Sequence, residues 1–123
     1  MGLDMYLTGE RCMSRLHSKP RALIGERYNL GYWRKHSCLH SYIVQQFNNG
    51  VDDCREICLD ESALQQILTA IREDQLPYTT GDLVEEYDST AKDRDLACFS
   101  DAIAWLTESD IQARRYVEYR ASW

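Results

Sequence analysis

The 123-residue chain has few residues that interrupt regular structure, with only two prolines, six glycines and no low-complexity run. This scarcity argues against a disordered chain. No hydrophobic stretch approaches the roughly 20 residues that a membrane-spanning helix needs. The opening MGLDMYLTGE has an acid where a signal peptide would have bases, and it has no apolar segment of the required kind. We therefore expect a cytoplasmic protein with one domain, residues 1–123, and no membrane segment.

The common signatures of small enzymes are also missing. The sequence has no glycine-rich phosphate loop, no G-x-S-x-G and no quartet of zinc ligands. Its five cysteines are an odd number, which together with the missing secretory signal indicates reduced thiols. Cys54 and Cys58 are spaced C-x3-C, unlike the C-x2-C of zinc or thioredoxin-like sites, and in a strand they would share one face. The sequence predicts no cofactor and no bound metal.

Acidic residues are concentrated in the middle of the chain. The net charge is −6, but residues 52–110 contain 16 acids and four bases, whereas residues 1–51 contain seven bases and three acids. A region this acidic repels nucleic acid, so we do not expect direct nucleic-acid binding. It would attract a protein with a basic patch, although acidic helix faces can also serve solubility alone.

Both ends of the chain alternate between apolar and polar residues, which predicts strands with one buried face. At the start, Leu3, Met5 and Leu7 alternate with polar neighbours, and at the end Val117, Tyr119, Ala121 and Trp123 share one face. Residues 9–31 are less regular, and 21–28 could be a short strand or a loop. The segment 51–60 can form another strand.

Three amphipathic helices are predicted between these strands. Residues 32–47 place Tyr32, Trp33, Leu39 and Ile43 on one stripe, and the Asn-Asn-Gly that follows is typical of a helix end. Asp60 is a candidate N-cap for a helix ending at Pro77. Asp95 is the candidate N-cap for the third helix, after an exposed loop over 77–94. The expected fold class is α+β: a small antiparallel sheet, including both terminal strands, packed against two or three helices.

Several segments resemble a family of small uncharacterised bacteriophage and prophage proteins. These segments are the opening MGLDMYL, the run GYWRKHSCLHSYIV, the acidic turn GVDDCRE and the terminal ASW. The resemblance spans most of the chain and implies a phage origin and a shared fold, but no reaction. The residues that match the family motifs and are candidates for a shared role are Trp33, Arg34, Lys35, His40, Cys54, Arg55 and Glu56.

Two small constellations could carry chemistry. His36 and His40 have the i, i+4 spacing that lets two imidazoles share a metal, with Asp52, Asp53 or Cys54 as a further ligand. Cys54 and His40 could instead be a nucleophile and its base, oriented by Asp52 or Glu56. Histidines on an apolar stripe are more often packed and hydrogen-bonded, so these readings remain alternatives.

Trp33, Arg34 and Lys35 combine an aromatic ring with two bases, which could grip phosphate or, with tyrosines, line a small-molecule pocket. The alternative is that both bases are solvated charges.

The function that the sequence favours is non-enzymatic. We expect a phage-encoded accessory protein that binds a host protein, or a protein complex with a basic patch, as an anti-defence or anti-CRISPR-type inhibitor. The binding surface would consist of the central acids Asp52, Asp53, Asp82, Glu85, Glu86, Asp88, Asp93, Asp95 and Asp101. Homo-oligomerisation is left open. The alternatives are a metal- or thiol-dependent enzyme and a nucleotide-binding module.

Overall fold

In the computed structural model, residues 2–13, 24–77 and 89–123 are described. The strands are β1 (Asp4–Met13), β2 (Gly25–Arg34), β3 (Ile57–Cys58) and β4 (Ala113–Ser122), and the helices are α1 (Ser37–Phe47), α2 (Glu61–Arg72) and α3 (Ser89–Thr107). The strands form one antiparallel sheet in the order β2-β1-β4-β3. The expected α+β class, with both terminal strands in the sheet, is confirmed.

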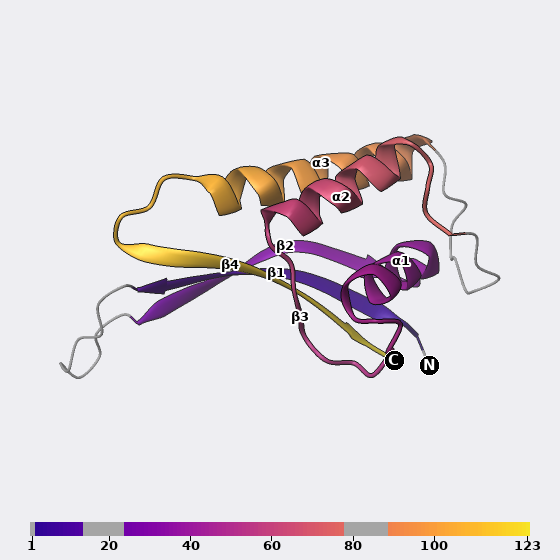
Figure 1. Cartoon of the computed structure of the whole chain (residues 1–123), viewed down its shortest axis with the longest axis horizontal. Helices are drawn as coiled ribbons and strands as arrows, with labels where there is room; N and C mark the ends of the chain where they lie inside the picture. The colour runs from indigo at the N-terminus through magenta and orange to yellow at the C-terminus, as the bar shows by residue number, and fades with distance from the viewer. Residues whose placement is uncertain (1, 14–23, 78–88) are drawn as a thin grey trace.

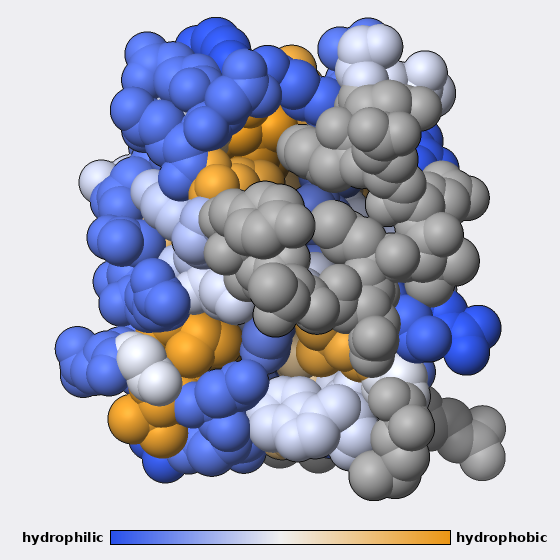
Figure 2. Space-filling model, turned by 90° about the vertical axis from the view of Figure 1, so that its right-hand side faces the viewer, coloured by the Kyte–Doolittle hydropathy of each residue, from blue (hydrophilic) through white to orange (hydrophobic). Residues whose placement is uncertain are grey.

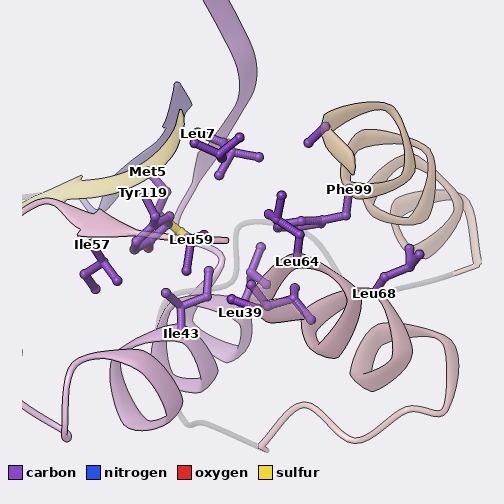
Figure 3. Packing of buried hydrophobic residues seen from close by; sticks show 14 of the residues in the cluster. Met5, Leu7, Leu39, Ile43, Ile57, Leu59, Leu64, Leu68, Phe99 and Tyr119 are labelled. Atoms are coloured by element: carbon purple, nitrogen blue, oxygen red, sulfur yellow. The ribbon is translucent and has the colours of Figure 1, made fainter. Parts of the chain in front are cut away.

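The helices cover one face of the sheet. Figure 1 shows α2 and α3 side by side along the strands, with α1 at the end of the molecule where both termini lie. The core lies between the layers. Met5, Leu7 and Tyr119 contribute from the sheet, Leu39 from α1 and Phe99 from α3, and each of these side chains is at most 1% exposed (Figure 3). Because every helix packs on this face, no element of the described part of the chain covers the opposite face, which we call the uncovered sheet face.

Two glycines allow the helical layer to approach the sheet closely. A Cβ on Gly9 of β1 would lie 2.8 Å from the ring of Trp105, and a Cβ on Gly31 of β2 would lie 2.7 Å from the Cys98 sulfur and from the Trp33 ring. These distances are shorter than a carbon or sulfur contact permits. Because neither glycine has a side chain, α3 can pack closely on β1 and β2.

The segment 32–36 corrects the prediction of a helix over 32–47. Tyr32, Trp33 and Arg34 end β2, and α1 begins only at Ser37. Lys35 has a left-handed φ of 58°. Its amide donates to the Leu3 carbonyl at 2.7 Å, which holds this turn against the start of β1. A β-bulge opposite Leu7 and Thr8 shifts the alternation of β2, so its period-two pattern is broken in the sequence.

The other helix ends are partly as expected. The Asp60 carboxylate caps α2 by accepting from the Ala63 amide at 2.8 Å, as predicted. However, α2 ends at Arg72 rather than at Pro77, because Asp74 adopts a left-handed φ of 54°. Helix α3 already includes Ser89, so residues 89–94 are helical and Asp95 is not an N-cap.

The expected strand over 51–60 is reduced to the two residues of β3. Cys54 has a left-handed φ of 61° and lies in the turn before β3, so it does not share a strand face with Cys58. All five cysteines lie in the described ranges and are free thiols. Within those ranges, none of the helices combines the length and the apolar character needed to cross a membrane.

Candidate functional site

His40 connects three parts of the fold at the end of the sheet near the C-terminus. Its Nε2 lies 2.8 Å from an Asp52 carboxylate oxygen, and its Nδ1 lies 2.6 Å from the Tyr119 hydroxyl. An ionised carboxylate can only accept, so Nε2 donates to Asp52, while Nδ1 bonds the Tyr119 hydroxyl. The turn after α1 is thereby tied to α1 and to β4.

Both ring nitrogens of His40 are thus engaged by groups of the fold itself. Burial, and to a smaller extent the Asp52 carboxylate, raises the pKa of Tyr119, so its hydroxyl remains a neutral donor. His40 and Tyr119 are both buried, while Asp52 is exposed. The geometry is that of a structural bridge whose carboxylate end reaches the surface.

A small hollow of about 10 Å³, room for about one water molecule, borders this bridge. Its lining includes His40, Asp52, Cys54, Val51 and Trp123. Val51 and Trp123 are about half exposed, and the Trp123 ring centre lies 5.9 Å from that of His40. Cys54 and His40 thus line the same hollow, as the thiol-enzyme alternative requires, but Asp52 already occupies the His40 nitrogen nearest to this turn.

The second histidine belongs to a separate buried cluster. His36 Nε2 lies 2.8 Å from one oxygen of Asp95, and the Trp33 indole donates to the other oxygen at 2.7 Å. The Trp33 ring also stacks on Phe99, with centroids 5.6 Å apart. This cluster ties α3 to the junction between β2 and α1.

The two histidines therefore do not converge on one ligand, contrary to the metal-pair interpretation. His36 precedes α1 and binds Asp95, whereas His40 lies inside α1 and binds Asp52. Within residues 2–13, 24–77 and 89–123, no group of three or more His, Cys, Asp or Glu side chains is arranged to hold a metal ion.

The structure describes only part of the predicted acidic surface, and one predicted member, Asp95, does not lie on the surface. Asp95 is buried, with 4% of its surface exposed, because its carboxylate serves Trp33 and His36. Asp93 and Asp101 are exposed on α3, and Asp52 and Asp53 are exposed after α1. The remaining predicted members lie outside the described residues: Asp82, Glu85, Glu86 and Asp88.

The family-motif candidates do not form one site. Trp33 faces the core while Arg34 is exposed on the opposite side of β2, so these two side chains of the predicted phosphate or small-molecule site do not lie together. Arg55 forms an ion pair of 2.6 Å with Asp53. Partial desolvation opposes ionisation of Asp53, but the hydrogen bonds from Arg55 outweigh it and lower the pKa of Asp53. Glu56 lies at the edge of the uncovered sheet face.

The outer surface of α2, α3 and their flanking turns is acidic. Seven acids are exposed there: Asp60, Glu61, Glu73, Asp74, Asp93, Asp101 and Glu108. The bases on the same surface are Arg72, Lys92 and Arg94, and Lys92 is bound to Asp74 at 2.9 Å. We call this surface the acidic helical layer. Most of its acids were not singled out from the sequence, because their gathering depends on α2 and α3 lying side by side (Figure 1).

The uncovered sheet face is the other surface that the sequence did not reveal. It contains a hollow of about 380 Å³ lined by Tyr6, Thr8, Arg27, Glu56, Glu118, Arg120 and Ser122. Desolvation, with added repulsion from Glu10 and Glu56, raises the pKa of Glu118. The alternation of β1 and β4 indicated that these side chains point away from the core, but not that every described helix would lie on the other face.

At the far end of the sheet, two arginines share one carboxylate. Arg11 Nε lies 2.7 Å and Arg115 Nε 3.0 Å from the same oxygen of Asp110. Arg115 also donates to the Trp105 carbonyl at 2.8 Å and lies over the Trp105 ring. The hydrogen bonds from Arg11 and then Arg115 hold the pKa of Asp110 far below its usual range.

This cluster predicts an acid-dependent loss of stability. A carboxyl whose pKa is lowered by folding stabilises the protein above its unfolded-state pKa, 3.8, and the contribution declines as the pH falls below that value. We expect Asp110→Asn to be less stable than wild type at pH 6, and the difference to shrink by pH 2.5. Urea unfolding at both pH values measures this, and a difference that does not change with pH would contradict it.

Seen from the end where the termini lie, the described part of the surface is mainly hydrophilic, with several hydrophobic areas (Figure 2). No known protein family, curated protein or solved structure matches this chain.

Proposed function

We propose that this protein is a non-enzymatic binding protein whose acidic helical layer docks on a basic patch of a partner protein. The observation that carries the proposal is the excess of exposed acids over bases on the outer surface of α2 and α3. Charge of one sign on one face speeds encounter with an oppositely charged face and orients it. The engaged nitrogens of His40 support a binding role over a reaction at that residue.

The resemblance to phage proteins suggests the kind of partner. A host protein that itself binds nucleic acid has the required basic patch, and occupying that patch would inhibit it. An anti-defence role of the anti-CRISPR type fits this description. The five free thiols suit a reducing compartment, and we place the protein in the cytoplasm of the host cell.

Binding should depend on salt and on the acids of α3. We expect the double variant Asp93→Lys/Asp101→Lys to bind its partner at least about tenfold more weakly, because it reverses two exposed charges on this layer. Raising the salt concentration should weaken the wild-type complex in the same direction. The partner is first captured from a bacterial lysate, identified by mass spectrometry and purified, and its affinity is then measured by calorimetry.

The matched control is Asp93→Asn/Asp101→Asn, which removes the charges without reversing them and should weaken binding to an intermediate extent. Circular dichroism checks that both variants remain folded. Binding that is equally tight in all three proteins, or that is insensitive to salt, would contradict the proposal.

A further inference from the structure

The uncovered sheet face differs from the acidic helical layer in its charge. It contains four arginines, Arg27, Arg34, Arg114 and Arg120, and four acids, Asp4, Glu10, Glu56 and Glu118. Tyr6, Tyr32 and Tyr116 are 40–51% exposed on the same face. Tyrosine and arginine are enriched at protein interfaces. The best complement for a face whose charges balance is one that is itself balanced, which favours neither nucleic acid nor a basic protein.

We propose that this face is the interface of a symmetric homodimer. β1 and β4 are the two central strands and pair along their whole length, with Tyr6 opposite Arg120 and Thr8 opposite Glu118. A twofold axis that runs parallel to the strands, midway between β1 and β4, lays β1 of one copy across β4 of the other. Residues that pair between β1 and β4 within one sheet therefore also face each other across the interface.

The contacts that this axis creates are complementary. The Tyr6 ring meets Arg120 of the second copy, a favourable pairing of an aromatic face with a guanidinium. The Thr8 hydroxyl meets the Glu118 carboxylate, and Glu10 meets the Tyr116 hydroxyl, so each of these acids meets a donor. Asp4 meets Ser122. In none of these four pairs do two like charges face each other.

Two charged groups on this face are only partly compensated within one copy. Among the described residues, Arg120 takes part in no ion pair, although it lies beside Glu118 on the same face. Desolvation and the neighbouring acids Glu10 and Glu56 raise the pKa of Glu118, and the opposing effect of Arg27 only partly offsets them. Both groups gain a new partner across the proposed axis.

The size of the face sets the expected strength. Three ten-residue strands and the short β3 cover about 500 Å² per copy. The two copies would bury about 1,000 Å², the size of a weak interface. The hollow over Thr8 would face the same hollow of the second copy, leaving room for bridging water. We therefore expect a dimer that dissociates on dilution into the low micromolar range. Its two acidic helical layers would face outward.

Sedimentation velocity of the full chain between 1 and 100 μM tests the dimer. We expect wild type to approach twice 14.4 kDa at the upper concentration. Arg120→Glu, which puts a carboxylate against Tyr6 and beside Glu118, should remain monomeric or dimerise at least about tenfold more weakly. Arg72→Glu makes the same charge change on the helical layer and should dimerise like wild type.

A second substitution keeps the test decisive if Arg120→Glu fails to fold. Tyr6→Ser removes an exposed ring from the same contact and leaves the core untouched, and it should also weaken dimerisation. The proposal is overturned if wild type is monomeric at 100 μM. It is also overturned if both folded interface variants dimerise as tightly as Arg72→Glu. Neither result bears on the acidic helical layer, whose test uses the affinity for a partner.

Discussion

Replacing Asp95 with alanine is expected to lower the free energy of unfolding by about 3 kcal/mol. The carboxylate is 4% exposed and accepts from the Trp33 indole and the His36 imidazole. Its removal leaves the partly buried indole donor without this partner, and it cuts the link between α3 and the end of β2. Urea unfolding at pH 7 measures the loss.

The matched control for this prediction is Asp95→Asn. An asparagine keeps an oxygen that accepts from Trp33 but loses the charge that binds His36, so we expect it to destabilise the protein less than alanine does. Asp93→Ala, two residues earlier on the exposed side of α3, should change stability by less than about 0.5 kcal/mol. If Asp95→Ala were as mild as Asp93→Ala, the cluster would not hold α3 in place.

Gly9→Val is expected to destabilise the protein by about 2 to 3 kcal/mol. The first carbon of the new side chain would lie 2.8 Å from the Trp105 ring and 3.0 Å from a Leu30 methyl group. Gly9 is buried in a central strand, so the backbone cannot move without disturbing β2 and β4. Helix α3 would have to shift, and Trp105 would no longer pack closely on the sheet.

The control for overpacking is Thr8→Val, one residue earlier in the same strand. Its side chain lies on the uncovered face and the two residues have nearly the same shape, so the change should be within about 1 kcal/mol of wild type. Thermal unfolding of both variants measures the contrast. Equal stability of Gly9→Val and Thr8→Val would show that the helical layer can move away from the sheet at little cost.

The elements that were predictable from the sequence are those whose pattern is local. β4 alternates without interruption, and its Val117, Tyr119 and Ala121 are buried as expected. The cap of α2 by Asp60 depends on residues three positions apart. The start of α1 was wrong because the bulge in β2 breaks the alternation there, and aromatic residues at 32–33 fit a helical stripe equally well.

The surfaces were less predictable, because they depend on which elements lie together. Counting acids along the chain placed Asp95 on the surface, but only its partners Trp33 and His36, about 60 residues away in sequence, bury it. The helical spacing of His36 and His40 suggested a shared ligand, whereas each has its own carboxylate partner. The balance of charges across β2, β1 and β4 follows from strand order and register.

On these proposals, the two exposed layers of the molecule have different partners. The partner of the acidic helical layer would be a basic protein, and that of the uncovered sheet face would be a second copy of the chain. Dimerisation would present the acidic layer twice, so a partner with two basic patches would bind more tightly through avidity.

An NMR titration of the 15N-labelled protein with its purified partner tests whether the acidic helical layer is the docking surface. We expect the largest amide shifts at exposed residues of α2 and α3, among them Glu61, Asp93 and Asp101, and a loss of these shifts in Asp93→Lys/Asp101→Lys. Shifts concentrated instead around the hollow of His40 and Asp52, with the helical layer unchanged, would contradict the claim that the acidic layer is the docking surface.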